Sequence, residues 1–162
     1  MFTVQAANTL AMLDVEKKDI YIRKLDAETG KDIAGAAFVL YKGAVADPNR
    51  IAEWTSDGTP HKLAAGLFSA GTDYYLKEVG APTGYRSAVM IKFRVDSTKK
   101  IVILEGNSNN VNGDRDTLLV RDEPIKLYLR KQNAFGTLLP GAVLKLAEYD
   151  ASQPDQMGAV IL

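Results

Sequence analysis

Short runs in which apolar and polar residues alternate recur along most of the chain. Ile20 and Ile22, for example, share one face of an extended segment, because strand side chains alternate with a period of two. Gly, Pro, Asn and Asp separate the runs, and helical periodicity is sustained nowhere. This pattern is typical of an all-β sandwich. It predicts strands at residues 19–25, 35–42, 50–55, 62–68, 73–79, 89–95, 100–104 and 117–122.

The same alternation places an ionisable group at the last inward-facing position of three predicted strands. These groups are Lys24, Glu78 and Asp122, and each shares its face with two apolar or aromatic residues of its strand. Charged side chains are rarely buried unless they are paired. One interpretation is that each group lies at a strand end in water, or that Lys24 joins an ordinary ion pair. The other interpretation is that all three groups meet inside the core.

A meeting of these groups has a chemical consequence. Burial in apolar surroundings favours the neutral, nucleophilic form of an amine and the protonated form of a carboxylic acid. When an amine is held against an Asp carboxyl group, positioning raises their effective molarity, and exclusion of water prevents the reverse reaction. A protonated Glu that bridges both groups can move protons between them. The product is an intramolecular isopeptide bond, formed without ATP.

The pattern around Lys24 returns near the C-terminus. Lys131 follows Lys24 by 107 residues, and each lysine precedes a Gly-containing turn, a Gly-Ala pair and a second apolar run. Residues 8–14 also match residues 116–122, at an offset of 108. A period this long indicates a string of domains. It predicts the closing strand of a preceding repeat and a linker at 1–18, a complete domain at 19–123, and the opening half of a following, truncated repeat at 124–162, which we expect to pack poorly or to dock on a neighbour.

Composition narrows the classes of function. The 162 residues include no cysteine, which excludes disulfides, Cys-ligated zinc, iron–sulfur clusters and thiol catalysis. Twenty basic and twenty acidic residues balance, so nothing points to nucleic acid or an anionic membrane as a partner. No apolar run approaches the roughly 20 residues of a membrane span. The N-terminal residues do not read as a signal peptide, so we expect any secretion signal to lie outside this chain.

Two motifs resemble those of a known family. Residues 24–38, Lys-Leu-Asp-Ala-Glu-Thr-Gly-Lys-Asp-Ile-Ala-Gly-Ala-Ala-Phe, resemble the opening motif of the B-type repeat domains of the collagen adhesin Cna and of the SpaA-type pilin domains of Gram-positive surface proteins. Residues 76–85, Leu-Lys-Glu-Val-Gly-Ala-Pro-Thr-Gly-Tyr, resemble the Glu-containing motif of that family. The resemblance extends over the whole repeat and both flanking pieces. It implies an all-β, prealbumin-like sandwich related to the immunoglobulin sandwich.

The resemblance also implies roles for particular residues. Lys24 would be the amine, Glu78 the catalytic acid and Asp122 the acceptor of an isopeptide bond between the first and last strands. Many family members have Asn at the acceptor position, so with Asp122 the leaving group would be water. Lys131 would serve the following domain and Asp14 the preceding one, and both lack their partners in this chain.

The function that the resemblance implies is structural. The domain would be a stalk or spacer of a cell-surface adhesin or pilin-like protein, with neighbouring repeats as its partners. The parent protein would be extracellular, on the bacterial surface, and anchored to the cell wall through segments outside this chain. No cofactor or metal is expected, and the only turnover would be one self-directed reaction.

Two other functions stay open. A binding module would grip a host extracellular matrix protein or glycan with loops 43–50 or 107–116, although both lack the aromatic residues that favour recognition. An enzyme on a transthyretin-like fold would depend on His61, the single histidine, which follows a proline in a predicted turn and reads as a surface residue. Loop 107–116 is rich in Asn and Asp but lacks the ligand spacing of an EF-hand calcium loop.

Overall fold

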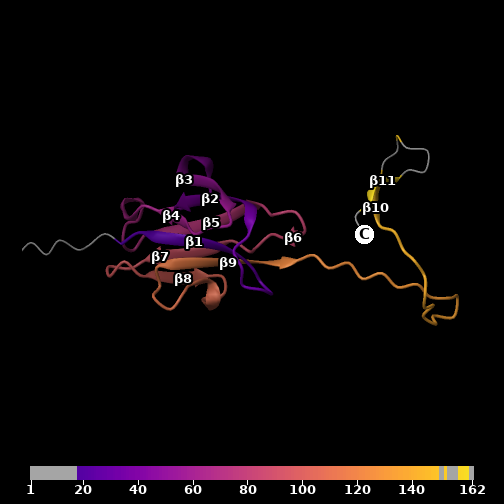
Figure 1. Cartoon of the computed structure of the whole chain (residues 1–162). Coiled ribbons are helices and arrows are strands. Elements are labelled where there is room, and N and C mark those ends of the chain that lie inside the picture. Colours follow the sequence, from indigo (N-terminus) through magenta and orange to yellow (C-terminus); the bar gives the residue numbers. More distant parts are fainter. Residues whose placement is uncertain (1–17, 150–151, 153–156, 161–162) are drawn as a thin grey trace, which may run out of the picture. The chain divides into compact units, whose positions relative to one another are not determined.

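The computed structural model describes residues 18–149, 152 and 157–160, which belong to two compact units (Figure 1). The first unit ends at Ile125 and the second begins at Lys126. Among the described residues, no helix is long and apolar enough to cross a membrane. The first unit contains strands β1 (Ile20–Asp26), β2 (Ala34–Lys42), β3 (Arg50–Asp57), β4 (His61–Leu63), β5 (Asp73–Gly80), β6 (Tyr85–Arg86), β7 (Ile91–Val95), β8 (Ile101–Glu105) and β9 (Thr117–Pro124), and the short 3₁₀ helices η1 (Asp47–Asn49), η2 (Ala65–Leu67) and η3 (Ser108–Asn110).

The strands of the first unit form two sheets that pack face to face. One sheet has the order β4-β1-β9-β6 and the other the order β3-β2-β5-β7-β8. β1 and β9 pair in parallel, with Lys24 opposite Val120 and Asp26 opposite Asp122. Figure 1 shows these two strands side by side along the unit. The first and last strands of the domain are therefore direct neighbours, although almost the whole domain separates them in sequence.

The core lies between the two sheets and follows the period-two alternation of the sequence. Inward residues of each sheet interdigitate, as in other sandwiches. Tyr74 and Phe93 are fully buried and stacked, with ring centroids 5.7 Å apart. The buried cluster consists of Ile20, Ile22, Ala36, Phe38, Leu40, Leu63, Phe68, Tyr74, Leu76, Ile91, Phe93, Val95, Ile101, Leu118 and Val120.

The predicted all-β sandwich is confirmed, and each predicted strand has a counterpart. The prediction of a strand through residues 62–68 is wrong in its second half, because β4 ends at Leu63 and η2 follows. There the Phe68 N–H turns back to the Ala65 carbonyl at 3.2 Å. The two-residue strand β6 was not predicted, because its only support is pairing with the distant end of β9.

His61 closes one edge of the sandwich. Its ring stacks on Trp54 with centroids 4.3 Å apart and an interplanar angle of 3°, and Trp54 in turn stacks on Phe38. His61 also begins β4, opposite Ile22. His61 is therefore a half-buried strand residue, and the prediction that it lies in a turn is wrong. Burial lowers the pKa of His61, and this effect outweighs the opposing charge of Asp57.

The pKa of His61 predicts a pH dependence of stability. Because the folded state disfavours the imidazolium, the unfolded chain binds the proton more tightly. The stabilisation is present above the unfolded pKa of about 6.5 and is lost as the pH falls below it. Denaturant unfolding at pH 7.5 and 5.5, followed by the fluorescence of Trp54, would measure the loss. A His61→Phe variant, which keeps a stacked ring without the titration, is expected to show a smaller change, and an equal change would contradict the assignment.

The second unit has little regular structure among its described residues. β10 (Ala147–Tyr149) and β11 (Met157–Val160) form an antiparallel pair, and Gln132 bridges Leu138. Residues 127–145 are exposed. The strand that the repeat pattern places before Lys131 is not formed. In the first unit, the equivalent β1 has β4 and β9 as partners, and the described residues of the second unit form no counterparts of these strands.

The turn after Lys131 nevertheless has hydrogen bonding similar to that of the turn after Lys24, with some of the bonds displaced by one residue. The Lys24 carbonyl accepts the N–H nine residues on, and the Lys131 carbonyl accepts the N–H eight residues on, both at 2.9 Å. A side chain caps each turn. Asp26 Oδ1 accepts the N–H groups two and three residues on, both at 2.8 Å, and Asn133 Oδ1 accepts those two and four residues on, at 3.0 and 2.9 Å. The repeat therefore extends from sequence to local structure.

Candidate functional site

The structure brings Lys24, Glu78 and Asp122 together between the two sheets. Their side chains are 1%, 1% and 0% exposed. Lys24 Nζ lies 3.0 Å from Glu78 Oε1 and also contacts Asp122 Oδ1. The interpretation that these groups lie at strand ends in water is therefore wrong. An ion-paired cluster and a reactive site both remain compatible with this geometry.

The strand register explains why these three side chains meet. Lys24 and Asp122 face inward from neighbouring parallel strands, and Asp122 lies two positions beyond the register partner of Lys24. Glu78 reaches the same point from the opposite sheet, because β5 pairs with β2 and places Glu78 opposite Phe38. The Phe38 ring lies beneath the amine, with Lys24 Nζ 5.6 Å from its centroid. The Phe38 ring gives the cluster an apolar surface on this side.

Hydrogen bonding distinguishes the two carboxyl groups. Glu78 Oε2 accepts the backbone N–H of Ala88 at 2.6 Å, which fixes the carboxyl plane and turns Oε1 towards Lys24. Asp122 has no such anchor: among the described residues, none makes a well-directed hydrogen bond to either of its oxygens. Burying a carboxyl group without hydrogen bonds is costly. The structure thus holds Asp122 against the amine without other polar support.

The electrostatics of the site favour a protonated Glu78. Desolvation raises the pKa of Glu78 above its usual range, and this outweighs the hydrogen bond from Ala88 and the interaction with Lys24, which lower it. A carboxylic acid whose pKa is raised holds its proton to higher pH and can donate it to a reacting group. A nucleophilic amine, a carboxyl carbon in contact with it, a proton donor and exclusion of water are the requirements of an amide condensation.

The remaining predicted site residues are not part of this cluster. Asp14 lies outside the described residues. Lys131 is exposed in the turn of the second unit, and no carboxylate within the described ranges forms an ion pair with it. The described part of the chain also contains no group of three His, Asp or Glu side chains that could hold a metal.

Loop 107–116, the alternative binding surface, borders an open hollow. The hollow has a volume of about 1090 Å³, and its lining includes Asn107, Asn109, Asn110, Arg121 and Glu123. None of the residues that line it is aromatic. The structure thus adds no aromatic recognition surface to this loop.

Sequence reasoning missed three residues that support the site. Ala88 contributes only its backbone N–H, which no side-chain pattern can reveal. Asp26 and Tyr85 are hydrogen-bonded to each other at 2.8 Å, and both belong to the recognised motifs. The inward parity of Asp26 relative to Lys24 was a usable signal, because it placed a further carboxyl group on the reactive face.

Comparison with known proteins finds solved structures that are similar to this chain and a family model that matches it. The C-terminal fragment of the pilus adhesin SpaC from Lactobacillus rhamnosus GG is 24% identical, with a TM-score of 0.49 over 69% of this chain and 47% of that one. The shaft pilin SpaA from the same organism is 17% identical, with a TM-score of 0.47 over 69% and 49%. The chain thus spans about half the length of these two.

Among curated proteins, nothing matches this chain. A family model does: the SpaA prealbumin-like fold domain matches residues 18–109, which is more than half of the 162 residues. The matched range contains Lys24 and Glu78 and ends before Asp122. The chain belongs to the family of SpaA prealbumin-like fold domains.

Proposed function

We propose that this domain is a stalk or spacer module of a bacterial cell-surface adhesin or pilin-like protein, and that it closes itself with an isopeptide bond between Lys24 and Asp122. The observation that carries the proposal is the contact of a fully buried amine with a fully buried carboxyl group, beside a second carboxyl group with a raised pKa. The parent protein would be displayed on the cell surface, with neighbouring repeats as its partners.

The reaction is a condensation. The neutral amine of Lys24 attacks the carboxyl carbon of Asp122, and Glu78 donates its proton to the carbonyl oxygen as the C–N bond forms. Glu78 then takes a proton from the nitrogen and returns it to the departing hydroxyl group. As the C–O bond breaks and one water leaves, the oxygen that Glu78 first protonated becomes the amide carbonyl and gives its proton back, so Glu78 regains its initial state.

The position of the bond suits a load-bearing module. β1 leads the chain into the domain and β9 leads it out, so a bond from Lys24 to Asp122 would carry a pull on the two ends. The hydrogen bonds within the two sheets would then not have to bear this force. By analogy with a disulfide that closes a loop of about 100 residues, the bond would add roughly 4–5 kcal/mol of stability. Disulfides are not open to this chain, which has no cysteine.

Intact mass of the denatured protein tests the proposal. The wild-type chain is expected to be lighter than its sequence by one water, because condensation releases one water. Lys24→Ala and Glu78→Ala variants are expected to have their full mass, since they lack the nucleophile and the proton donor. Lys77→Ala, which removes an exposed lysine beside Glu78, serves as the matched control and should keep the deficit.

Proteolytic fragments should then join the peptide that contains Lys24 to the peptide that contains Asp122. Full mass in the wild-type chain would refute the crosslink. In that case the three groups would be an ion-paired cluster, and the stalk would depend on the sandwich alone.

A further inference from the structure

A hydrogen bond outside the reacting groups joins β1, which carries Lys24, to β6, which follows Glu78 along the chain. The Tyr85 hydroxyl donates to Asp26 Oδ2 at 2.8 Å. Asp26 is 9% exposed and lies two residues after Lys24, directly opposite Asp122 in the parallel register. Tyr85 lies seven residues after Glu78. The bond therefore ties the segment that follows Glu78 to the strands that carry the amine and the acceptor.

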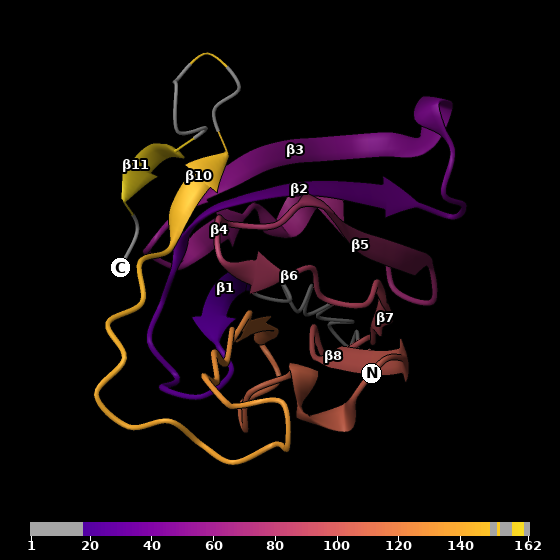
Figure 2. The same cartoon turned by 90° about the vertical axis from the view of Figure 1, so that its right-hand side faces the viewer.

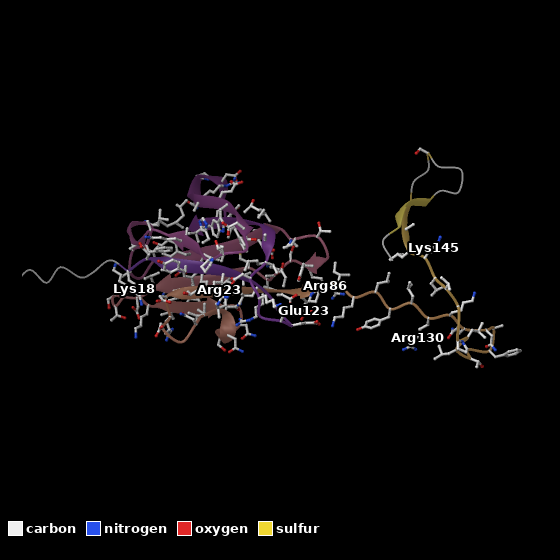
Figure 3. The ribbon with its side chains drawn as sticks, viewed as in Figure 1. Lys18, Arg23, Arg86, Glu123, Arg130 and Lys145 are labelled. Carbon is white, nitrogen blue, oxygen red and sulfur yellow. The ribbon has the colours of Figure 1, made fainter. Side chains whose placement is uncertain are left out.

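The Tyr85–Asp26 bond matters for Glu78 because the chain after Glu78 leaves β5, passes through Tyr85 and then comes back to Glu78 at Ala88. β5 ends at Gly80, and the chain crosses to the other sheet, where Arg86 pairs with Glu123 just beyond Asp122. Figure 3 shows Arg86 and Glu123 next to each other at this end of the unit. The Ile125 N–H also bonds the Gly84 carbonyl at 2.7 Å. After Arg86 the chain turns back towards Glu78.

The return brings Ala88 to Glu78, where its N–H donates to Oε2. A backbone N–H cannot rotate by itself, so its direction depends on how the whole segment is held. β6 is only two residues long and offers little pairing of its own. Tyr85 is the side chain of that strand that reaches across to β1.

We infer that the Tyr85–Asp26 hydrogen bond is a latch that positions Glu78 for the crosslinking reaction. This inference rests on the proposed function. The hydrogen bond of the Tyr85 hydroxyl goes to Asp26 and not to a reacting group, so Tyr85 is a positioning residue. With the latch closed, Ala88 holds Oε2 and leaves Oε1 facing the Lys24 amine. With the latch open, the Glu78 carboxyl group loses this fixed orientation.

Asp26, which accepts the hydrogen bond from the Tyr85 hydroxyl, is suited to form a strong hydrogen bond. Backbone N–H groups, led by that of Thr29, and the Tyr85 hydroxyl lower the pKa of Asp26, so the carboxylate is charged at neutral pH. Hydrogen bonds to a charged acceptor are stronger than neutral ones. The second unit shows that Asn fits the same turn, because Asn133 caps it there. Asp26→Asn is therefore a variant that keeps the turn and weakens only the latch.

The test measures how fast the bond between Lys24 and Asp122 forms, which we call closure. A short pulse of cell-free synthesis labels new chains, and samples denatured at intervals are weighed for the loss of water. Tyr85→Phe, which removes one hydroxyl, is expected to slow closure by about 10- to 100-fold, as misplacement of a reacting group does. Asp26→Asn should slow it less. Tyr75→Phe is the matched control, because its ring contacts Lys92 on the outer face of the same strand as Glu78.

A pH profile separates positioning from a merely structural role. Closure requires protonated Glu78, so the rate falls as the pH rises through the pKa of that group. The Ala88 hydrogen bond lowers this pKa, so losing it should move the fall in rate of Tyr85→Phe to higher pH. Ala88→Pro removes the N–H itself and should give the same displacement. The double variant of Tyr85 and Ala88 should then be no slower than the slower single variant.

Each outcome has a distinct meaning. A Tyr85→Phe chain that closes at the wild-type rate, or one that is slower with an unchanged pH profile, overturns the latch and leaves the crosslink intact. A wild-type chain that never closes at any pH overturns the proposed function itself. Trp54 fluorescence confirms that each variant is folded, and Asp26→Asn provides the second test if Tyr85→Phe does not fold.

Discussion

A Lys24→Met/Asp122→Leu double variant is expected to be about 4–5 kcal/mol less stable than the wild-type domain. The double variant removes the amine and the acceptor carboxyl group and fills their space with apolar side chains, so it loses the crosslink. Glu78 keeps its hydrogen bond from Ala88, and its raised pKa favours the neutral acid. The closed loop would contain almost the whole domain, which is why the entropic loss is large. Guanidinium unfolding, followed through the fluorescence of Trp54, would measure the difference.

This double variant distinguishes a covalent bond from an ion pair by the sign of the change. Replacing a buried ion pair with well-packed apolar residues is often neutral or stabilising by about 1–4 kcal/mol. Equal or greater stability of the double variant would therefore show that no bond had formed. The single variant Asp122→Ala is expected to be less stable than the double variant, since it leaves the buried Lys24 with Glu78 alone.

Phe38→Ala is expected to reduce stability by about 3–5 kcal/mol and also to slow closure of the crosslink. Phe38 is fully buried, and its ring lies below the Lys24 amine. Removing the ring opens a cavity beside the reacting groups, which water can enter because the cavity has polar groups on one side. Water there would favour the charged amine and carboxylate over the reactive neutral forms. Denaturant unfolding measures the first effect, and the mass deficit after pulse synthesis measures the second.

Phe93→Ala is the matched control for this cavity. Phe93 is equally buried and stacks on Tyr74 rather than beneath the amine. Its removal should lower stability by a similar amount and leave the rate of closure in the folded domain close to that of the wild type. Equal slowing in both variants would mean that closure depends on overall stability and not on the dry surface below Lys24.

The sequence predicted correctly those features that depend only on neighbouring residues, such as the face on which a strand side chain lies. Alternation in β1, β5 and β9 placed Lys24, Glu78 and Asp122 on inward faces, because strand parity needs only a few neighbouring residues. The repeat pattern likewise predicted the turn after Lys131. Alternation could not decide between a solvated strand end and a buried cluster, since that depends on how far the opposite sheet covers each strand end.

Contacts between different strands could not be predicted from the sequence. β6 forms because the end of β9 lies beside it, and nothing within Tyr85 and Arg86 shows this partner. The stacking of His61 on Trp54 depends on an edge where strands of the two sheets meet. The strand expected before Lys131 failed for the same reason, because a strand is stable only with partners, which alternation alone does not provide.

The turn that follows each lysine has a consequence for the order in which a growing chain is completed. Its hydrogen bonds span nine residues after Lys24, so it can close soon after those residues leave the ribosome, whereas Asp122 is synthesised 98 residues after Lys24. The turn that holds the Lys24 amine can therefore form well before Asp122, the acceptor, has been synthesised. Because β9 is the last strand to arrive, bond formation would mark a finished domain, and an incomplete chain would stay open.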